Sequence, residues 1–116
     1  MQIEGKTIIG FTEKINIISS KGEEKGLVAR IDTGATTSSI DNELASELRL
    51  GPIIKIKSIR SAHGKTARPV VMARIKIAGR RLKVKFTIAD RSHMRYKILI
   101  GQNILKRGFL IDASKH

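Results

Sequence analysis

The sequence feature that most constrains the fold is the alternating stretch VVMARIKIAGRRLKVKFTIAD at residues 70–90. Apolar side chains occupy every second position in two runs, which is the period of a β-strand with one buried face. The segment Ala78-Gly79-Arg80 separates the runs, so a β-hairpin is predicted. Its buried face would carry Val71, Ala73, Ile75, Ile77, Leu82, Val84, Phe86 and Ile88, and its solvent face Arg74, Lys76, Arg81, Lys83 and Lys85.

Strand signals also dominate on both sides of this hairpin. The further strands predicted from apolar content and alternation lie at residues 6–18 (one or two strands), 27–31, 53–59 and 109–112. Two polar stretches, 21–26 and 60–69, predict a turn and a hairpin loop with Gly64 at its tip.

One short helix is predicted at about residues 41–49, because Ile40, Leu44 and Leu48 fall on one helical face before Gly51-Pro52. The candidates for its N-cap are Ser38, Ser39 and Asp41. A second helical turn is predicted after Gly101. The chain as a whole predicts one compact, mostly β domain over residues 1–116, with one or two short helices.

The composition restricts the cellular setting. The chain contains no cysteine, so neither disulfides nor thiolate metal ligands are available. The N-terminal segment lacks the apolar run of a signal peptide, and no segment approaches the roughly 18 apolar residues that a membrane-spanning helix needs. We therefore expect a cytoplasmic protein that does not enter a membrane.

The formal net charge of +13 is unevenly distributed. Residues 1–50 hold six Lys and Arg against eight Asp and Glu, whereas residues 51–116 hold seventeen against two. This field favours acidic partners, which include nucleic acid, an acidic protein segment or an anionic surface. Nucleic acid is the less favoured of these, because only four aromatic side chains could stack on bases, and a solvated Lys-rich face also explains the charge.

The candidate chemistry lies in RIDTGATTSSI at residues 30–40, where an apolar strand runs directly into Asp32. Hydrolysis of a peptide bond without a metal or a covalent intermediate needs a base for the attacking water and an acid for the carbonyl oxygen or leaving amine. Two carboxyl groups that share one proton supply both, because like charges about 3 Å apart cannot both ionise. The alternative is an ordinary turn aspartate, since Asp-x-Gly turns are common.

The sequence contains Asp-Thr-Gly once, at residues 32–34, so one chain cannot supply both carboxyl groups. If Asp32 is catalytic, the active site requires a homodimer in which two copies of Asp32 meet at a two-fold axis. Gly34 would allow a sharp turn, and the Thr33 hydroxyl could hydrogen-bond across the pair. Asp32, Thr33 and Gly34 are therefore the predicted catalytic segment.

The segment IDTGATTSSI resembles the active-site segment of retropepsin-type aspartic proteases, and the resemblance continues in order along residues 27–112. The hairpin around His63-Gly64 stands where those enzymes have their flap, and ILIGQNIL resembles their helix entry, in which two hydrophobic residues precede Gly-Arg, then Asn or Asp, then Leu-Leu. The resemblance implies a closed β-barrel of the acid-protease fold that forms a homodimer. Residues 1–26 would add N-terminal strands to this core.

The double pattern DTGATTSS at residues 32–39 and DRSHMRYKILIG at residues 90–101 is most similar to small prokaryotic proteins named ATP-dependent zinc proteases. Histidine occurs only at positions 63, 93 and 116, without a His-Glu-x-x-His motif, so no zinc ligand set is evident. No Gly-rich loop ending in Lys-Ser or Lys-Thr marks an ATP site. We expect no metal and no cofactor, and we interpret His93 as a surface or loop residue.

Two positions depart from the viral retropepsins. Those enzymes carry Asp where this chain has Thr36 and Arg where it has Gln102, and in them the two charges form an ion pair that braces the dimer. Losing both charges avoids leaving one of them buried and unpaired. A neutral contact between Thr36 and Gln102 is the expected substitute.

The resemblance implies a homodimeric aspartic endopeptidase with the two Asp32 carboxyl groups at the floor of a cleft. Ala35, Thr36 and Thr37 would bind an extended peptide, and the hairpin at 60–68 would close over it. His63 and Gly64, at the tip of that hairpin, are the remaining predicted substrate-binding residues.

Two details of this cleft have alternative interpretations. Ile31, Ile59 and Ile100 could line the cleft, but core packing is the simpler role for each of them. The basic side chains of the hairpin could select acidic substrates, or they could form a solvated loop.

Two other functions are compatible with the same sequence. The chain could be a catalytically inactive retropepsin-like dimer that binds an acidic peptide or nucleic acid. It could also be a monomer that acts only with a partner supplying the second Asp.

Overall fold

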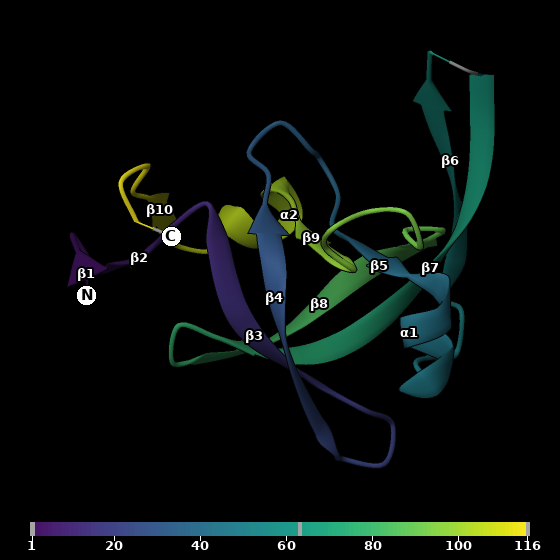
Figure 1. Cartoon of the computed structure of the whole chain (residues 1–116), viewed down its shortest axis with the longest axis horizontal. Coiled ribbons are helices and arrows are strands. Elements are labelled where there is room, and N and C mark those ends of the chain that lie inside the picture. The colour runs from purple at the N-terminus through teal and green to yellow at the C-terminus, as the bar shows by residue number, and fades with distance from the viewer. Residues whose placement is uncertain (1, 63, 116) are drawn as a thin grey trace.

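The computed structural model describes residues 2–62 and 64–115, and Figure 1 shows their arrangement. The elements in chain order are β1 (Gln2–Ile3), β2 (Lys6–Ile9), β3 (Thr12–Ile18), β4 (Glu24–Ile31), β5 (Ser39–Asp41), α1 (Asn42–Glu47), β6 (Lys55–Ser61), β7 (Gly64–Ile77), β8 (Arg80–Ala89), β9 (Ile98–Ile100), α2 (Gln102–Leu105) and β10 (Phe109–Ile111). The mostly β class with two short helices is confirmed.

Six of these strands form a closed barrel. β3 pairs with β4, β4 with β9, β9 with β5, β5 with β8, β8 with β7, and β7 again with β3. Closure leaves no free edge among the six strands, which removes the usual site of edge-to-edge aggregation. β6 pairs with β7 beyond this ring, so the β6–β7 hairpin projects from the barrel (Figure 1). The predicted closed barrel is confirmed.

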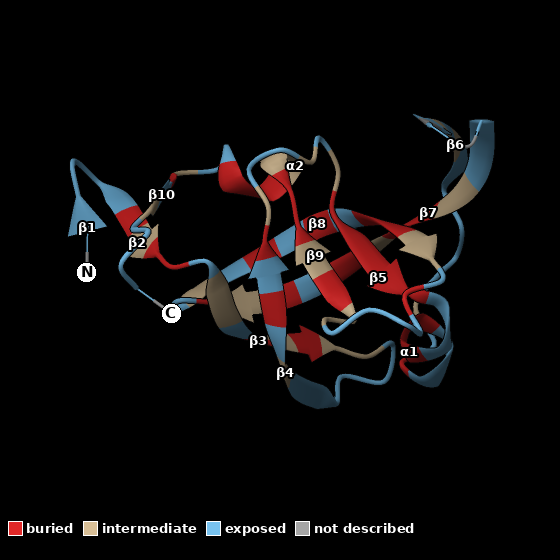
Figure 2. Ribbon diagram, turned by 45° about the horizontal axis from the view of Figure 1, so that its top comes forward, coloured by how far each residue is buried: buried red, intermediate tan, exposed pale blue. Residues whose placement is uncertain are grey.

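The predicted central hairpin is β7 and β8. Its register places Val71 opposite Phe86 and Ile75 opposite Leu82, and all four side chains are buried as expected. Ala78 and Gly79 both have positive φ angles, 48° and 79°, as the two-residue turn of type I′ requires. The exposed and buried positions alternate along both strands in Figure 2. Sequence alternation therefore predicted this part of the fold almost completely.

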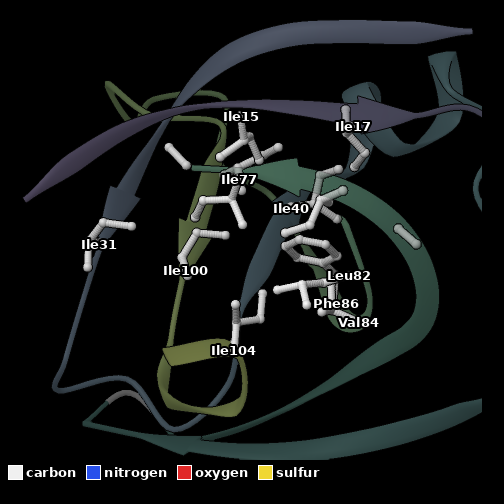
Figure 3. Packing of buried hydrophobic residues seen from close by; sticks show 14 of the residues in the cluster. Ile15, Ile17, Ile31, Ile40, Ile77, Leu82, Val84, Phe86, Ile100 and Ile104 are labelled. Carbon is white, nitrogen blue, oxygen red and sulfur yellow. The ribbon is translucent and has the colours of Figure 1, made fainter. Parts of the chain in front are cut away.

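The core fills the barrel interior. Phe86, Ile40 and Ile100 are fully buried, and Figure 3 shows them among aliphatic side chains from both sides of the barrel. Ile31 is 4% exposed and also lies in this cluster, so the core interpretation of Ile31 and Ile100 is correct. Ile59 lies on the projecting hairpin and is half-buried.

The predicted hairpin loop at 60–69 is largely wrong. β6 and β7 stay paired from Lys55 opposite Val70 to Ser61 opposite Gly64, so the hairpin is strand almost to its tip. Its residues are mostly exposed, and with no buried face there is no apolar alternation to reveal the strands. The predicted turn at 21–26 is also too long, because β4 already begins at Glu24, opposite Ile18.

The helix α1 is shorter than the predicted 41–49, but its apolar face is as expected, with Leu44 and Leu48 buried. Asp41 occupies the N-cap position without making a side-chain cap hydrogen bond. Its carboxylate instead accepts the Arg91 N–H at 2.8 Å. Asp41 therefore connects the helix start to the segment before β9.

A second, smaller sheet joins the two ends of the chain. Its order is β1-β2-β10, with β10 parallel to β2. Arg80 links this sheet to the barrel, because its guanidinium lies 4.5 Å from the ring centroid of Phe109 and donates to the Gly108 carbonyl oxygen at 3.4 Å. None of the helices described is long and apolar enough to cross a membrane. The cytoplasmic location stays a prediction.

Candidate active site

Asp32 is the first residue after β4, where the chain leaves the barrel wall. Its backbone N–H donates to the Ile100 carbonyl oxygen at 2.9 Å, which attaches the start of the loop to β9. Its Oδ1 accepts a hydrogen bond from the Gly34 N–H at 2.9 Å, which closes an Asx turn. Asp32 is half-buried. The residue is therefore fixed by local bonds and remains partly open to solvent.

The same Asx turn occurs at two other aspartates. Asp90 Oδ1 accepts the Ser92 N–H at 3.0 Å, and Asp112 Oδ1 accepts the Ser114 N–H at 2.9 Å. Hydrogen bonds from the side chain and backbone of these serines hold the pKa of each carboxyl group below its ordinary value. The turn alone does not distinguish Asp32 from a structural aspartate, so its surroundings have to do so.

The loop at 32–37 lies directly against the residue that precedes α2. A Cβ atom on Gly101 would lie 2.8 Å from the Ala35 carbonyl oxygen and 2.7 Å from the Thr37 carbonyl carbon, both closer than real Cβ contacts. Gly101 has an extended backbone with φ −105°, so glycine is required for space and not for a left-handed conformation. The loop can occupy its position only because residue 101 has no side chain.

Gln102 holds the loop from the same side. Its backbone N–H donates to the Ala35 carbonyl oxygen at 2.8 Å, and its side-chain Nε2 donates to the Thr33 carbonyl oxygen at 2.8 Å. The expected Thr36–Gln102 contact is therefore wrong. The amide instead donates to the backbone of Thr33, the second residue of the loop, while Thr36 is exposed.

Ser38 anchors the far end of the loop and is fully buried. Its Oγ accepts the Gly101 N–H at 2.9 Å and donates to Asn103 Oδ1 at 2.7 Å. Its carbonyl oxygen accepts the Thr87 N–H at 2.9 Å, and Asn103 Nδ2 donates to the Lys85 carbonyl oxygen at 3.0 Å. The loop is thus bonded at one end to β9 and at the other to β8 and α2.

The structure brings the predicted loop residues together on one exposed segment. Asp32, Ala35 and Thr37 are half-buried, and Thr33, Gly34 and Thr36 are exposed. Gly64 opens β7 and forms the last pair of the hairpin, opposite Ser61, where it is exposed and has a positive φ of 110°. His63 lies outside the described residues, so its predicted substrate contact stays a prediction.

A row of side chains lies beside Asp32 on one outer face of the barrel. Arg30 is paired with Leu99, and Leu99 is paired in turn with Ser39. Because side chains alternate along a strand, Arg30 points away from the core, while Ile31 points into it. We call Arg30, Leu99 and Ser39 the outer row.

Arg91 reaches the outer row from the segment between β8 and β9, which runs beside β5 in Figures 1 and 2. Its Nη1 donates to Ser39 Oγ at 3.4 Å, and its Nε donates to the Tyr96 carbonyl oxygen at 3.0 Å. Arg91 is 9% exposed, and Asp41, which accepts its backbone N–H, is 3% exposed. A buried cation is therefore attached to the outer row through Ser39.

The charges around Arg91 connect it with the loop and the hairpin. Burial lowers the pKa of its guanidinium, and the nearby charge of Arg68 on β7 lowers it further, whereas Asp41 and Asp32 raise it. An arginine remains protonated at neutral pH even so. Arg91, Arg68 and Asp32 therefore lie within electrostatic reach of one another.

Sequence reasoning assigned no role to Arg91, and it considered Asp41 and Ser38 only as candidates for the helix N-cap. Arg91 belongs to the DRS segment on which the family resemblance rests, and that was the available signal. Its burial depends on β5, a strand of three residues that is too short to show an alternating pattern. A polar tripeptide in a loop gives no indication from sequence that its middle residue is buried.

Two hollows flank the loop at 32–37. One, of about 370 Å³, is lined by Thr33, Gln102, Leu105, Lys106, Phe109, Leu110 and Ile111. The other, of about 190 Å³, is lined by Thr36, Thr37, Ser38, Lys55, Lys57, Val70, Lys85, Phe86, Thr87 and Asn103. The first is mostly apolar and the second is rimmed by lysines. Within residues 2–62 and 64–115, no group of three or more His, Cys, Asp or Glu side chains could hold a metal ion.

Solved structures with the same fold include viral proteases. The chain aligns with the EIAV protease complexed with the inhibitor HBY-793 with a TM-score of 0.65 and 22% identity, over 91% of this chain and 90% of that one. The solution structure of the simian foamy virus (mac) protease gives a TM-score of 0.59 and 21% identity, over 82% and 91%. A protein of unknown function from Legionella pneumophila subsp. pneumophila str. Philadelphia 1 gives 0.61 and 20%, over 93% and 94%.

A family model decides the classification. Residues 41–116 match the RimB-like family, described as retropepsin-like aspartic endopeptidase RimB. The matched residues include Arg91 and the Gly101-Gln102-Asn103 support and begin after the Asp-Thr-Gly segment. No curated protein sequence matches the chain. The expected retropepsin resemblance is confirmed, and the chain belongs to the RimB-like family of retropepsin-like aspartic endopeptidases.

Proposed function

We propose that the chain is a homodimeric aspartic endopeptidase in which two Asp32 carboxyl groups, one from each subunit, activate the water that attacks a peptide bond. The observation that carries this proposal is the placement of Asp32. Its loop is bonded to β9, β8 and α2, yet the residue is half-buried and stays partly open to solvent. A catalytic carboxyl group needs this combination of fixed geometry and access to substrate.

The reaction needs one of the two Asp32 carboxyl groups to be ionised and the other to be protonated. The ionised carboxylate takes a proton from water as the water oxygen bonds to the peptide carbonyl carbon, and the protonated carboxyl donates to the carbonyl oxygen. Collapse of the tetrahedral species breaks the C–N bond: the carboxyl that took the proton from water gives it to the leaving amine, and a hydroxyl of the tetrahedral species returns its proton to the other carboxylate as the product carboxylic acid forms. Each Asp32 changes its role during one cycle, so the pair ends in the state in which it began.

The surface beside Thr33 supports a dimer. β10 is the outer strand of the β1-β2-β10 sheet in the described chain, so its second edge is open to another strand. The hollow of about 370 Å³ between this strand and Thr33 is mostly apolar, and Leu110 is exposed. A second copy that covers this surface about a two-fold axis would bring the two loops together.

The β6–β7 hairpin is the proposed cover of the cleft. It extends away from the barrel, and in Figures 1 and 2 it rises toward the same end of the molecule as the loop after β4. Exposed strands with few packing contacts are the elements that move on binding. Closure over an extended peptide would exclude water from the reacting carbonyl group.

The charges around the loop favour acidic side chains in the substrate. Arg30 and Arg91 lie at the outer row, and Arg68 lies on the hairpin within electrostatic reach of Arg91. The hollow beside Thr36 adds three lysines. Clustered cations raise the association rate and affinity of acidic peptides and oppose basic ones. We therefore propose unstructured protein segments rich in Glu and Asp as the preferred substrates.

The test compares wild-type protein with Asp32→Asn on an unstructured acidic polypeptide and on a neutral one of the same length, between about pH 3 and pH 8. Asp112→Asn is the matched control, because Asp112 makes the same Asx turn. Wild type and Asp112→Asn should cleave, the acidic chain faster, and Asp32→Asn should not. Binding of the polypeptide without cleavage by a proven wild-type dimer would instead identify the inactive binding module.

A further inference from the structure

Three adjoining hollows lead across the outside of the barrel to the Asp32 loop. The first, of about 710 Å³, lies between the turn at 19–22, the segment at 50–54 and the outer face of the β7–β8 hairpin. The second, of about 210 Å³, shares Met72 and Lys83 with the first. The third is the hollow of about 190 Å³ beside Thr36, which shares Lys85 and Asn103 with the second. Because neighbouring hollows share lining residues, the three form one continuous path.

Within the residues that the structure describes, every charged side chain that lines this path is a cation. Arg107 donates from Nη1 to the Lys83 carbonyl oxygen at 2.8 Å, which holds its guanidinium at the second hollow. The lysines of the path have no acidic partner, since the ion pairs of the described chain use Lys25, Lys76 and Lys115. These lysines are Lys21, Lys55, Lys57, Lys83 and Lys85. We call the three hollows together the basic track.

The strand register places like charges side by side on the track. Arg74 on β7 is paired directly with Lys83 on β8, and both side chains are exposed on the outer face (Figure 2). Like charges directly opposite each other in an antiparallel pair are destabilising. The next pair, Lys76 and Arg81, has a counter-charge, because Lys76 Nζ donates to Glu24 Oε2 at 2.9 Å. The described chain supplies no carboxylate to Arg74 and Lys83, so an anionic occupant would relieve their repulsion.

The lining of the track fits an acidic polypeptide better than a nucleic acid. Leu50, Pro52 and Met72 line the first hollow, and their apolar surface suits side chains of a polypeptide and not phosphate groups. Phe86 is the single aromatic among the described lining residues, and it is fully buried, so bases have no ring on which to stack. The last hollow is lined by two threonines of the Asp32 loop, where a polypeptide would be cleaved.

We propose that the basic track is an exosite, which binds an acidic stretch of the substrate outside the cleaved segment and guides that segment to the Asp32 loop. This inference rests on the proposed function. It places part of the selection of substrates on the outside of the barrel, so the residues at the scissile bond need not be acidic themselves. A homodimer would have one track on each subunit, so an acidic stretch on either side of the scissile bond could use one.

The experiment uses substrates that share one neutral segment, taken from the cleavage site of the neutral polypeptide, and that carry an acidic, a neutral or a basic tail. The tail has about ten residues, because an extended chain of that length reaches at most about 33–36 Å, close to the 37 Å extent of the protein. Wild type should cleave the acidic-tailed substrate with a kcat/KM about 10-fold above that of the neutral-tailed one. Added salt should reduce this advantage, since the charges on the track are exposed.

The deciding variant is Arg74→Gln combined with Lys83→Gln, because neither residue lines the hollow beside Thr36. It should lose about 3-fold to 10-fold of kcat/KM on the acidic-tailed substrate alone. Arg74→Glu combined with Lys83→Glu should instead favour the basic tail. Lys6→Gln combined with Lys14→Gln is the matched control, because both lysines are exposed and lie outside the three hollows. The control should keep the wild-type preference.

Melting temperature and molecular mass first show whether each variant is a folded dimer, and Lys21→Gln replaces the deciding variant if that variant does not fold. Binding of the acidic tail alone is measured in parallel on Asp32→Asn protein with and without the two track substitutions. A folded variant that keeps the full preference and affinity for the acidic tail overturns the exosite while leaving the protease in place. Tighter binding of single-stranded RNA than of the acidic tail overturns the polypeptide as occupant. A wild-type dimer that cleaves no substrate overturns the proposed function, and loss of tail affinity in the track variant would then still support an acidic-peptide site.

Discussion

A Cβ atom on Gly101 would lie 2.8 Å from the carbonyl oxygen of Ala35, so the residue before α2 and the Asp-Thr-Gly loop share a contact that only glycine permits. The two residues are far apart in sequence, and Gln102 N–H donates to the same Ala35 oxygen at 2.8 Å. The position of the loop that carries Asp32 is therefore set by its contacts with Gly101 and Gln102, at the start of α2.

Gly101→Ala should damage the site without touching Asp32. The new methyl group must push the loop backbone away, which should lower the free energy of unfolding by about 1–3 kcal/mol. The loop would move relative to its partner, and kcat/KM should fall about 10-fold to 100-fold. Urea unfolding and peptide cleavage measure the two effects. A variant as stable and as active as wild type would show that the loop does not depend on this contact.

Gln102→Ala removes the hydrogen bond from Nε2 to the Thr33 carbonyl oxygen. Loss of one such bond should lower the free energy of unfolding by about 1 kcal/mol. Because Thr33 follows Asp32 directly and is no longer held in place, kcat/KM for peptide cleavage should fall by a larger factor than this loss of stability alone would cause. Gln2 is the other glutamine of the chain and is exposed on β1, so Gln2→Ala is the matched control. Equal activity in the two variants would exclude a role for the Gln102 side chain.

Ser38→Ala tests the far anchor of the loop. Its Oγ accepts from Gly101 and donates to Asn103 in a fully buried position, so the variant leaves the buried Gly101 N–H and the half-buried Asn103 Oδ1 without this partner. The free energy of unfolding should fall by about 1–3 kcal/mol. Ser58→Ala, at an exposed position on β6, should change it little. The comparison needs only thermal or urea unfolding, and similar stability in both variants would contradict the expected anchoring.

Stability should fall at acidic pH through three exposed carboxyl groups. The hydrogen bond from Lys76 lowers the pKa of Glu24 below 4.5, and the serine two residues after Asp90 and Asp112 lowers each of theirs below 3.8. A lowered pKa adds stability above the ordinary value, and that stability is lost as pH falls through the folded-state value. The loss should therefore begin near pH 4.5 and continue downward. Urea midpoints of a Glu24→Gln, Asp90→Asn, Asp112→Asn triple variant should depend less on pH there, and an equal dependence would refute the assignment.

Much of the fold could be predicted from sequence, because one buried face imposes a visible period. The β7–β8 hairpin, with Val71, Ile75, Leu82 and Phe86 buried, is the clearest case. The paired strands of the β6–β7 hairpin are longer than the sequence predicted. Most of their residues are exposed, so the polar sequence there resembles that of a loop.

The candidate site likewise has one part that could be predicted from the sequence and one part that could not. The Asp32 segment has a sequence signature, and its position at the end of β4 could be predicted from the strand before it. The contacts of Ser38, Gln102 and Arg91 depend on which segments meet across β9 and β5, and no local pattern encodes that. Arg91 in particular becomes a candidate only when its bond to Ser39 is known.

The central claim is that Asp32 is half of an active site, and mixing subunits tests it most directly. Wild type at fixed concentration is incubated with increasing Asp32→Asn protein, and cleavage of a saturating substrate is measured. Because mixed dimers would hold a single Asp32, activity per wild-type chain should fall toward zero as the variant comes into excess, while the same excess of Asp112→Asn should not reduce it. Undiminished activity in excess Asp32→Asn protein, under conditions where subunits exchange, would contradict the shared site.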